Sequence, residues 1–427
     1  MSLSTRTPTL GELSEVDREV LAKKTLRVLI FGQAMGSAGF GSSVAVGGLI
    51  IKDLLRGDRF AGAASAVVTI GGAVASLLLA GIMAARGRRV GLVTGYGVAM
   101  IGALTIVVGA QNRRVEVFLV GCLLFGQAQG ANQSARFAAA DLAPPEQRGQ
   151  YISNLLFAST FGAVLGPVFV GQSQRVGTAF GLWKYTGPYL VAFAFFAAAA
   201  ANTFLRLRPD PLIVAGGLEP GRGVRLPPVR TALRVVRRIP NARLAMAAVV
   251  TGHTVMVAIM TMTPVHMKDH GHSLTLSGFV IALHIAGMYA LSPVIGRWSD
   301  RVGRIPVLLT GGATLFSAGV VTAAAGHVPA LLFAGLFLLG LGWSCIMVSG
   351  SALLSESVPT ANRIAVQGTS DVMMGVFGAT AGFGSGFVKR AYGFHVLAEI
   401  GAVIAVALVV TLLRVLRIAQ ADVTTAV

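Results

Sequence analysis

The chain has 427 residues, of which 54% are apolar and only 12% are charged, and its mean hydropathy is +0.73. Soluble domains carry about 25% charged residues, so this composition excludes an ordinary soluble protein and indicates an integral membrane protein. The net charge of +18 lies in loops between apolar runs, as in the cytoplasmic loops of membrane proteins, so we expect no nucleic-acid partner.

Apolar runs recur along the whole chain, and they predict an all-α membrane protein with twelve transmembrane helices. A helix that spans a bilayer needs roughly 20 mostly apolar residues. The predicted spans are residues 27–51, 61–84, 90–110, 116–138, 150–174, 186–205, 243–265, 274–296, 306–326, 329–353, 364–388 and 394–414. The longest polar gap divides these spans into two six-helix halves.

The predicted organisation has five parts. They are a cytoplasmic N-terminal tail (1–26), an N-terminal six-helix half (27–205), a cytoplasmic central loop (206–242), a C-terminal six-helix half (243–414) and a cytoplasmic C-terminal tail (415–427). Most of the 35 Lys and Arg residues fall on the side of the two tails. Excess Lys and Arg mark the cytoplasmic side, so we predict a multi-pass protein of the plasma (inner) membrane with both termini in the cytoplasm. We expect it to be a monomer in the lipid bilayer.

The two halves form an internal repeat. One constant offset brings first-half residues onto similar residues of the second half. The matched pairs are Gly81 with Gly296, Arg86 with Arg301, Asp141 with Glu356, Pro144 with Pro359, and Arg148 with Arg363. Parallel repeats of this kind are typical of secondary transporters, in which one half rocks against the other around a central site.

The loop after the eighth predicted span carries a charged motif, Gly296-Arg-Trp-Ser-Asp300-Arg301-Val-Gly303-Arg304. It resembles the signature loop of the major facilitator superfamily, and the resemblance covers the whole chain. The resemblance implies a gating role, in which Asp300 pairs with an arginine in one state and releases it in the other. The alternative is that the loop serves only topology and solubility.

The first copy of this loop departs from the pattern. It reads Gly81-Ile-Met-Ala-Ala85-Arg86-Gly87-Arg88-Arg89, with Ala85 where the acid is expected, so half of the gate is missing or replaced. The fourth predicted span departs as well. Many members of the superfamily carry an arginine linked to proton coupling where this chain has Gly126.

Imidazole and thioether groups are concentrated in the seventh and eighth predicted spans. Residues 253–288 hold five of the seven histidines and five of the thirteen methionines. Met256 and Met260 lie one turn apart on one helix, as do His284 and Met288 on the next, and Met256 and His284 share a depth near the membrane midplane. Such soft ligands select Cu(I) over hard cations. Against this, methionine in an apolar helix usually serves packing.

The motifs Met256-Val-Ala-Ile-Met260 and His284-Ile-Ala-Gly-Met288 resemble those of the CcoA-type copper importers within the superfamily. That resemblance implies that these four residues bind the transported metal. The following outer loop holds a second set of soft groups that could collect metal at the entrance: His266, Met267, His270 and His272. Exposed loop histidines are also often incidental.

Asp371 is an acid inside the eleventh predicted span. Ionisable groups within the membrane are costly and usually functional, so Asp371 could gain and lose a proton during transport. The alternative is a structural pairing with Arg363.

Together these features predict a secondary active transporter that works by alternating access and imports a soft transition metal, copper being the expected substrate. A proton-coupled exporter of a drug or small metabolite is the alternative, and a non-transporting membrane sensor is a third. The chain shows no phosphate-binding loop and no nucleophile–base pair, so we expect neither enzymatic activity nor a bound cofactor, with copper only as substrate.

Overall fold

The computed structural model describes residues 10–56, 63–168, 170–218, 223–226, 229–326 and 328–424. Within these ranges every regular element is a helix, which confirms the all-α class. Residues 1–9 and 425–427 of the two predicted tails lie outside the described residues.

The first part of the chain contains the helices that form the first half of the repeat. They are α1 (Glu15–Leu54), α2 (Ala63–Arg86), α3 (Arg88–Gln111), α4 (Val115–Phe125), α5 (Gln127–Asp141), α6 (Arg148–Val168), α7 (Val170–Ala179) and α8 (Gly187–Arg206). α1 begins well before the predicted span. Its start is capped by the Ser14 hydroxyl, which accepts a hydrogen bond from the Asp17 N–H at 3.2 Å.

Two short helices lie in the central loop, α9 (Pro211–Val214) and α10 (Val229–Arg238). The helices that follow are α11 (Pro240–Asp269), α12 (Leu274–Tyr289), α13 (Ser292–Val302), α14 (Arg304–Ala324), α15 (Pro329–Ser357), α16 (Thr360–Tyr392) and α17 (Phe394–Thr424).

Nine of the described helical segments are long and apolar enough to cross a membrane. A multi-pass membrane protein is therefore supported, whereas the count of twelve spans stays a prediction. The predicted span 116–138 is divided between α4 and α5 at Gly126, and the span 274–296 is divided between α12 and α13. The span 364–388 lies in α16, whose first half carries the polar residues Gln367, Ser370 and Asp371.

Close helix packing requires a glycine at position 126. A Cβ atom at this position would lie 2.8 Å from the backbone nitrogen of Gly72, on α2. No real Cβ atom approaches another backbone so closely, and α2 cannot move aside as a flexible side chain could. An arginine side chain at this position would not fit against this backbone.

The described structure divides into two compact units. Unit 1 comprises Met1–Pro144, Ala158–Val235 and Val358–Gly375, and unit 2 comprises Pro145–Phe157, Val236–Ser357 and Val376–Val427. The first turns of α6 thus belong to unit 2, and the first half of α16 belongs to unit 1.

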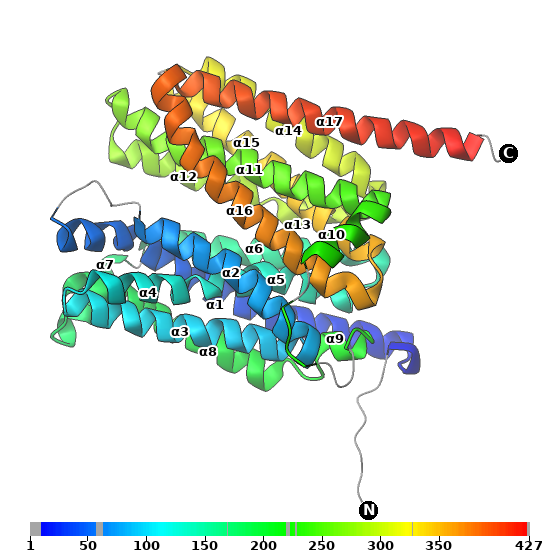
Figure 1. The fold of residues 1–427 in the computed structure, drawn as a ribbon, viewed down its shortest axis with the longest axis horizontal. Coiled ribbons are helices and arrows are strands. Elements are labelled where there is room, and N and C mark those ends of the chain that lie inside the picture. The colour runs from blue at the N-terminus through cyan, green and yellow to red at the C-terminus, as the bar shows by residue number, and fades with distance from the viewer. Residues whose placement is uncertain are drawn as a thin grey trace, which may run out of the picture. The chain divides into compact units, whose positions relative to one another are not determined.

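Glycines allow close helix packing inside each unit. In unit 1, α3 runs beside α4 and α8 (Figure 1), and a Cβ on Gly121 of α4 would lie 2.6 Å from the Ile106 nitrogen of α3. In unit 2, α14 packs on α15 and α17, and a Cβ on Gly342 of α15 would lie 2.9 Å from the Leu315 nitrogen. Small residues at such contacts let helix backbones approach in a membrane, where packing drives helix association.

Candidate functional site

The second signature loop lies within unit 2 and joins α13 to α14. Its acid, Asp300, accepts hydrogen bonds from the backbone N–H groups of Gly149 at 2.9 Å and Gln150 at 2.8 Å. Both donors lie in the first turn of α6, where the unpaired N–H groups and the helix dipole favour a negative charge. Asp300 also forms an ion pair with Arg304.

Arg304 connects this loop to a second acid. Its Nη2 lies 2.7 Å from Glu356 Oε1, at the end of α15, and also donates to the Pro145 carbonyl at 2.9 Å. The structure therefore brings together four of the five predicted gating residues. Gly296 lies against Ser153 and Gly149, Gly303 begins α14 with a φ of 94°, and Arg301 is exposed.

The first signature loop, in unit 1, keeps the arginine–acid pair but not the acid of the motif. Gly87 begins α3 with a φ of 90°, as Gly303 begins α14. Arg88 Nε donates to Asp141 Oδ2 at 2.8 Å, and both side chains are 1% exposed. The same guanidinium donates to Gln367 Oε1 at 2.7 Å.

The backbone N–H groups that start α3 are bound by an acid that the sequence analysis missed. Asp210, at the end of the segment after α8, accepts from the N–H of Arg88 at 3.1 Å and of Arg89 at 2.7 Å. It also caps α9, because it accepts from the Leu212 N–H at 2.9 Å. No local signal marks Asp210. The repeat could have indicated an arginine partner for Asp141, since Glu356 is its repeat partner, but the same offset gives Arg89 in place of Arg88.

Asp371 takes part in a second buried ion pair of unit 1. Its Oδ1 lies 2.5 Å from Arg136 Nη2 of α5, and the side chains are 2% and 0% exposed. The sequence analysis considered Arg363 as its partner, so the role of Arg136 was missed. An arginine inside the otherwise apolar Ala135–Ala140 stretch was the available signal. Arg136 is also held by Gln133, which accepts at 2.7 Å through its side-chain oxygen.

Unit 1 also contains buried and half-buried polar side chains on α1, α3, α5 and α6. Gln33 Nε2 donates to Ser159 Oγ at 2.8 Å, and the Tyr96 hydroxyl donates to Asn132 Oδ1 at 2.8 Å. Several buried atoms have no hydrogen-bond partner among the described residues: Gln33 Oε1, Gln129 Oε1, Ser370 Oγ and Asp371 Oδ2. Buried polar atoms are usually paired, so these atoms can receive a solute or water.

The predicted metal ligands lie in unit 2. Met256 and Met288 are buried, Met260 is half-buried, and His284 is fully enclosed. The Nδ1 of His284 lies 2.9 Å from the Leu336 carbonyl of α15, and its Nε2 has no partner among the described residues. Since a carbonyl only accepts, Nδ1 carries the proton and Nε2 has a free lone pair.

The two predicted ligand pairs share α15 as a neighbour. Gly252, one turn before Met256, lies against Ile346 of α15, and Gly287 lies against the Phe337 carbonyl of the same helix. Among the described residues, no three His, Cys, Asp or Glu side chains come together as a metal site. A copper site would therefore depend on thioether ligands.

The residues of the predicted outer loop differ in their hydrogen bonds and in their burial. His266 Nε2 donates to the Gly326 carbonyl at 2.7 Å, and His270 Nδ1 donates to the His266 carbonyl at 2.8 Å. Both line a cavity of about 350 Å³ that also includes His395, which the sequence analysis missed. Met267 is buried in the core, and His272 is half-buried.

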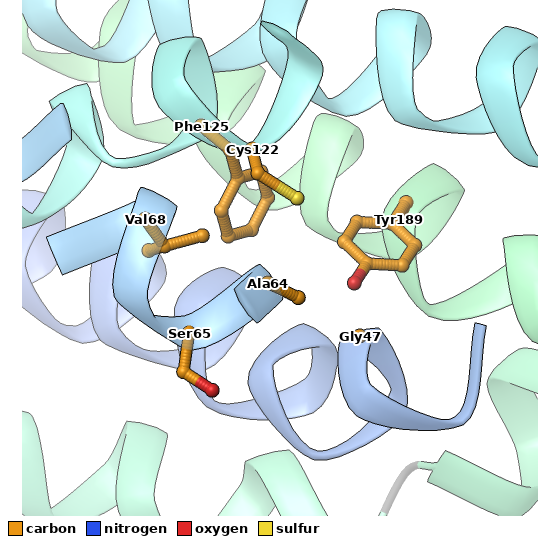
Figure 2. Close-up of a pocket in the computed structure, with 7 residues that line it drawn as sticks. All are labelled: Gly47, Ala64, Ser65, Val68, Cys122, Phe125 and Tyr189. Carbon is orange, nitrogen blue, oxygen red and sulfur yellow. The ribbon is translucent and has the colours of Figure 1, made fainter. Parts of the chain in front are cut away.

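A much smaller cavity lies in unit 1, between α1, α2, α4 and α8 (Figure 2). Its lining residues are Gly47, Ala64, Ser65, Val68, Cys122, Phe125 and Tyr189. Its volume is about 10 Å³, room for about one water molecule, so it is not a substrate site.

Comparison with known proteins places these features in a family. The sequence profile of the Major Facilitator Superfamily matches residues 28–288 and 266–425. The chain is 37% identical to an uncharacterised transporter, YdeG of Bacillus subtilis, over 91% of both chains. It is 25% identical to the riboflavin transporter RfnT of Brucella anthropi, over 88% of this chain and 92% of that protein.

Solved structures show the same fold. The human organic anion transporter MFSD10 superposes with a TM-score of 0.77 at 15% identity, covering 92% of this chain and 99% of that one. The proton:xylose symporter XylE superposes with a TM-score of 0.74 at 14% identity, covering 93% and 96%. With the repeated loops and the matched sequence profile, these likenesses establish that the chain belongs to the Major Facilitator Superfamily of secondary transporters.

Proposed function

We propose that this transporter moves a polar organic metabolite, and that the Arg136–Asp371 pair lies at its binding site and couples transport to protons. The observation that carries this proposal is the buried ion pair, whose Asp371 Oδ2 has no partner among the described residues. Gln33 and Gln129 offer further unpaired amide oxygens in the same unit.

The energetics support a functional role for the pair. Removing two charges from water is expensive, and replacing a buried ion pair by apolar residues is often neutral or stabilising. An ion pair buried within two predicted membrane spans is therefore better explained by a role in transport than by a contribution to stability. A protonated Asp371 would release Arg136 for an anionic or hydrogen-bonding solute, and ionised Asp371 would compete with that solute.

The relatives support this class of substrate. RfnT is named for riboflavin, and proline/betaine transporters of Escherichia coli are 26% identical to this chain over 75% of its length. These solutes are polar organic molecules, and riboflavin and proline carry N–H or O–H donors that the unpaired amide oxygens of unit 1 could accept.

The test is uptake of riboflavin, proline and betaine into proteoliposomes with and without an imposed pH gradient. We expect Asp371→Asn to remove the dependence of uptake on the gradient, while exchange without a gradient survives. Glu399→Gln is the matched control, because Glu399 is an exposed acid of a membrane-spanning helix. If uptake by the Asp371→Asn variant depends on the pH gradient as strongly as uptake by the parent does, Asp371 serves only as a structural partner of Arg136.

Copper import is a second candidate, and one observation favours it. Metal-bound histidines usually donate their other ring N–H to a carbonyl or carboxylate, and His284 holds Nδ1 on the Leu336 carbonyl with Nε2 free. Buried Met256 and Met288 could supply thioethers, which suit Cu(I).

This candidate has its own test. Met256→Ala and His284→Ala should abolish copper accumulation in cells and Cu(I) binding by the purified protein, with unchanged membrane expression. Met246→Leu is the control, because Met246 is a buried methionine of the same helix. Normal accumulation in both variants would exclude the site and leave the metabolite proposal standing.

The orientation is also a proposal. The excess of Lys and Arg on one side supports both termini in the cytoplasm and placement in the plasma membrane. Labelling of cysteines introduced at exposed positions, from each side of intact cells, would test it.

A further inference from the structure

The helix α10, in the central loop, has two chemically distinct faces. At about 100° of rotation per residue, its four arginines fall within an arc of about 100°. These are Arg230, Arg234, Arg237 and Arg238. Val229, Ala232, Leu233 and Val236 occupy the opposite side of the helix. α10 is therefore strongly amphipathic, with a basic face and an apolar face.

The two faces of α10 differ in their exposure to solvent. Ala232 and Val236 are 2% and 4% exposed, so the apolar face is used in packing. All four arginines are exposed, and within the part of the chain that the structure describes none of them forms an ion pair. The basic face is thus presented outward without an acidic partner among the described residues.

Further exposed side chains lie near α10 in the sequence. Arg225 precedes the helix and Arg243 follows it in the first turns of α11, and both are exposed. Val224 and Leu226 are 50% and 60% exposed. Exposed apolar residues close in sequence to a basic helical face are characteristic of segments that lie at the boundary between headgroups and acyl chains.

We infer that the basic face of α10 binds the phosphate groups of anionic phospholipids in the leaflet next to the central loop. The inference rests on the cytoplasmic placement of that loop, because the inner leaflet is the anionic one. Guanidinium groups bind phosphate through paired N–H donors, which favours phosphate-bearing headgroups over a diffuse attraction to negative charge. The lipid would hold the linker between the two halves of the repeat close to the membrane.

The experiment is native mass spectrometry of the full chain released from nanodiscs that contain phosphatidylcholine with increasing phosphatidylglycerol. The parent should retain phosphatidylglycerol. A variant with Arg230→Gln, Arg234→Gln, Arg237→Gln and Arg238→Gln should lose at least tenfold in apparent affinity for it. The same four positions changed to Lys should lose much less, since charge is kept.

A charge-matched control variant distinguishes lipid binding at the basic face of α10 from a general effect of the net charge of the protein. Four exposed arginines of the predicted outer loops, Arg56, Arg114, Arg175 and Arg390, are changed to Gln in one variant. This control should retain phosphatidylglycerol as the parent does. Equal losses in the two Gln variants, or full retention by the α10 variant, would overturn the inference.

A soluble polyanion is the remaining outcome. If the parent in pure phosphatidylcholine binds RNA or a polyglutamate peptide, the α10 Gln variant does not, and phosphatidylglycerol does not compete, the surface belongs to a soluble partner and the lipid inference is wrong. No transported substrate enters these measurements, so their failure would leave the proposed transport function untouched.

Discussion

The two signature loops occupy equivalent places in the repeat, yet they hold the chain in different ways. In unit 2, Asp300 binds the first N–H groups of α6, and Arg304 joins it to Glu356. In unit 1, Ala85 stands at the position of Asp300, and Asp210 binds the first N–H groups of α3 instead.

The two loops share an arginine–acid pair. Arg88 and Arg304 each directly follow a glycine with positive φ, and their acids, Asp141 and Glu356, are repeat partners. The two pairs differ in the contacts that lie beside them. In unit 2, a carboxylate binds the start of α6 through two hydrogen bonds. In unit 1, Arg88 donates to Gln367 of α16.

The two acids make similar contacts and differ in their place in the motif. Asp210 binds the start of α3, about 120 residues away in the chain, and also caps its own helix α9. Asp300 binds the start of α6, about 150 residues away, through its charge. Each set of contacts lies within one unit. Because Asp300 belongs to the signature motif and Asp210 does not, we expect changes at Asp300 to alter transport and changes at Asp210 to alter mainly stability.

The largest effect on stability should come from Asp141→Asn. Arg88 would remain buried without its charge partner, which costs about 3–5 kcal/mol. Glu356→Gln should cost only about 1 kcal/mol, because Glu356 is 25% exposed and Arg304 keeps Asp300 and the Pro145 carbonyl. Melting temperatures of the purified variants in detergent test this ranking, and equal decreases would show that burial does not separate the two pairs.

Asp300→Asn should have the next largest effect, and it should appear in transport. Loss of a carboxylate from a partly buried helix start is worth up to about 2 kcal/mol. We expect slower transport, by roughly tenfold, with unchanged substrate preference, because the loop acts on the conformational equilibrium. Initial uptake rates across a panel of competing solutes measure both quantities. An altered competition profile at an unchanged rate would contradict a gating role.

Asp210→Asn should be milder. Asparagine retains one acceptor oxygen for the N–H groups of Arg88, Arg89 and Leu212 but lacks the charge, so we expect a loss of about 1 kcal/mol. The melting temperature should fall while the uptake rate per folded molecule stays near that of the parent. Glu399→Gln, an exposed acid, is the control and should shift neither quantity. A slowed uptake equal to that of Asp300→Asn would mean that both loops gate.

Much of the fold was predictable from composition, since apolar runs report membrane spans directly. The sequence could not show that the predicted span 116–138 is divided at Gly126, nor that the backbone of α2 packs against this glycine, because that contact depends on the fold. Comparison of the two signature loops within the sequence showed that Ala85 stands where an acid is expected. It did not find Asp210, because a residue in an irregular segment far along the chain has no periodic pattern to identify its target.

The candidate site shows the same limit. Asp371 was recognisable as an acid in a predicted membrane span, but its partner Arg136 lies in another helix, and only the fold brings the two together. His284 and the methionines were found by spacing on each helix. Their common neighbour α15 has no sequence signal, because helix packing partners depend on shape rather than on residue type.

The smallest and most discriminating change is Ala85→Asp, which restores the absent acid. By the repeat, Ile364 and Ala365 correspond to Gly149 and Gln150, but α16 already begins at Thr360, so the N–H groups at its start, in unit 1, that lack a helical acceptor are those of Thr360 and Ala361. The new carboxylate should bind them and stabilise the protein by about 0.5–1 kcal/mol. If this contact forms in only one transport state, uptake should also slow, because the added energy favours that state alone.

Combining Ala85→Asp with Asp210→Asn separates two explanations of any stabilisation by the new acid. Independent helix starts predict that the two shifts in melting temperature add, whereas a new acid that takes over the N–H groups of Arg88 and Arg89 should gain far more when Asp210 is removed. An unchanged melting temperature and uptake rate in the single variant would show that the first loop has lost the geometry of the gate along with its acid.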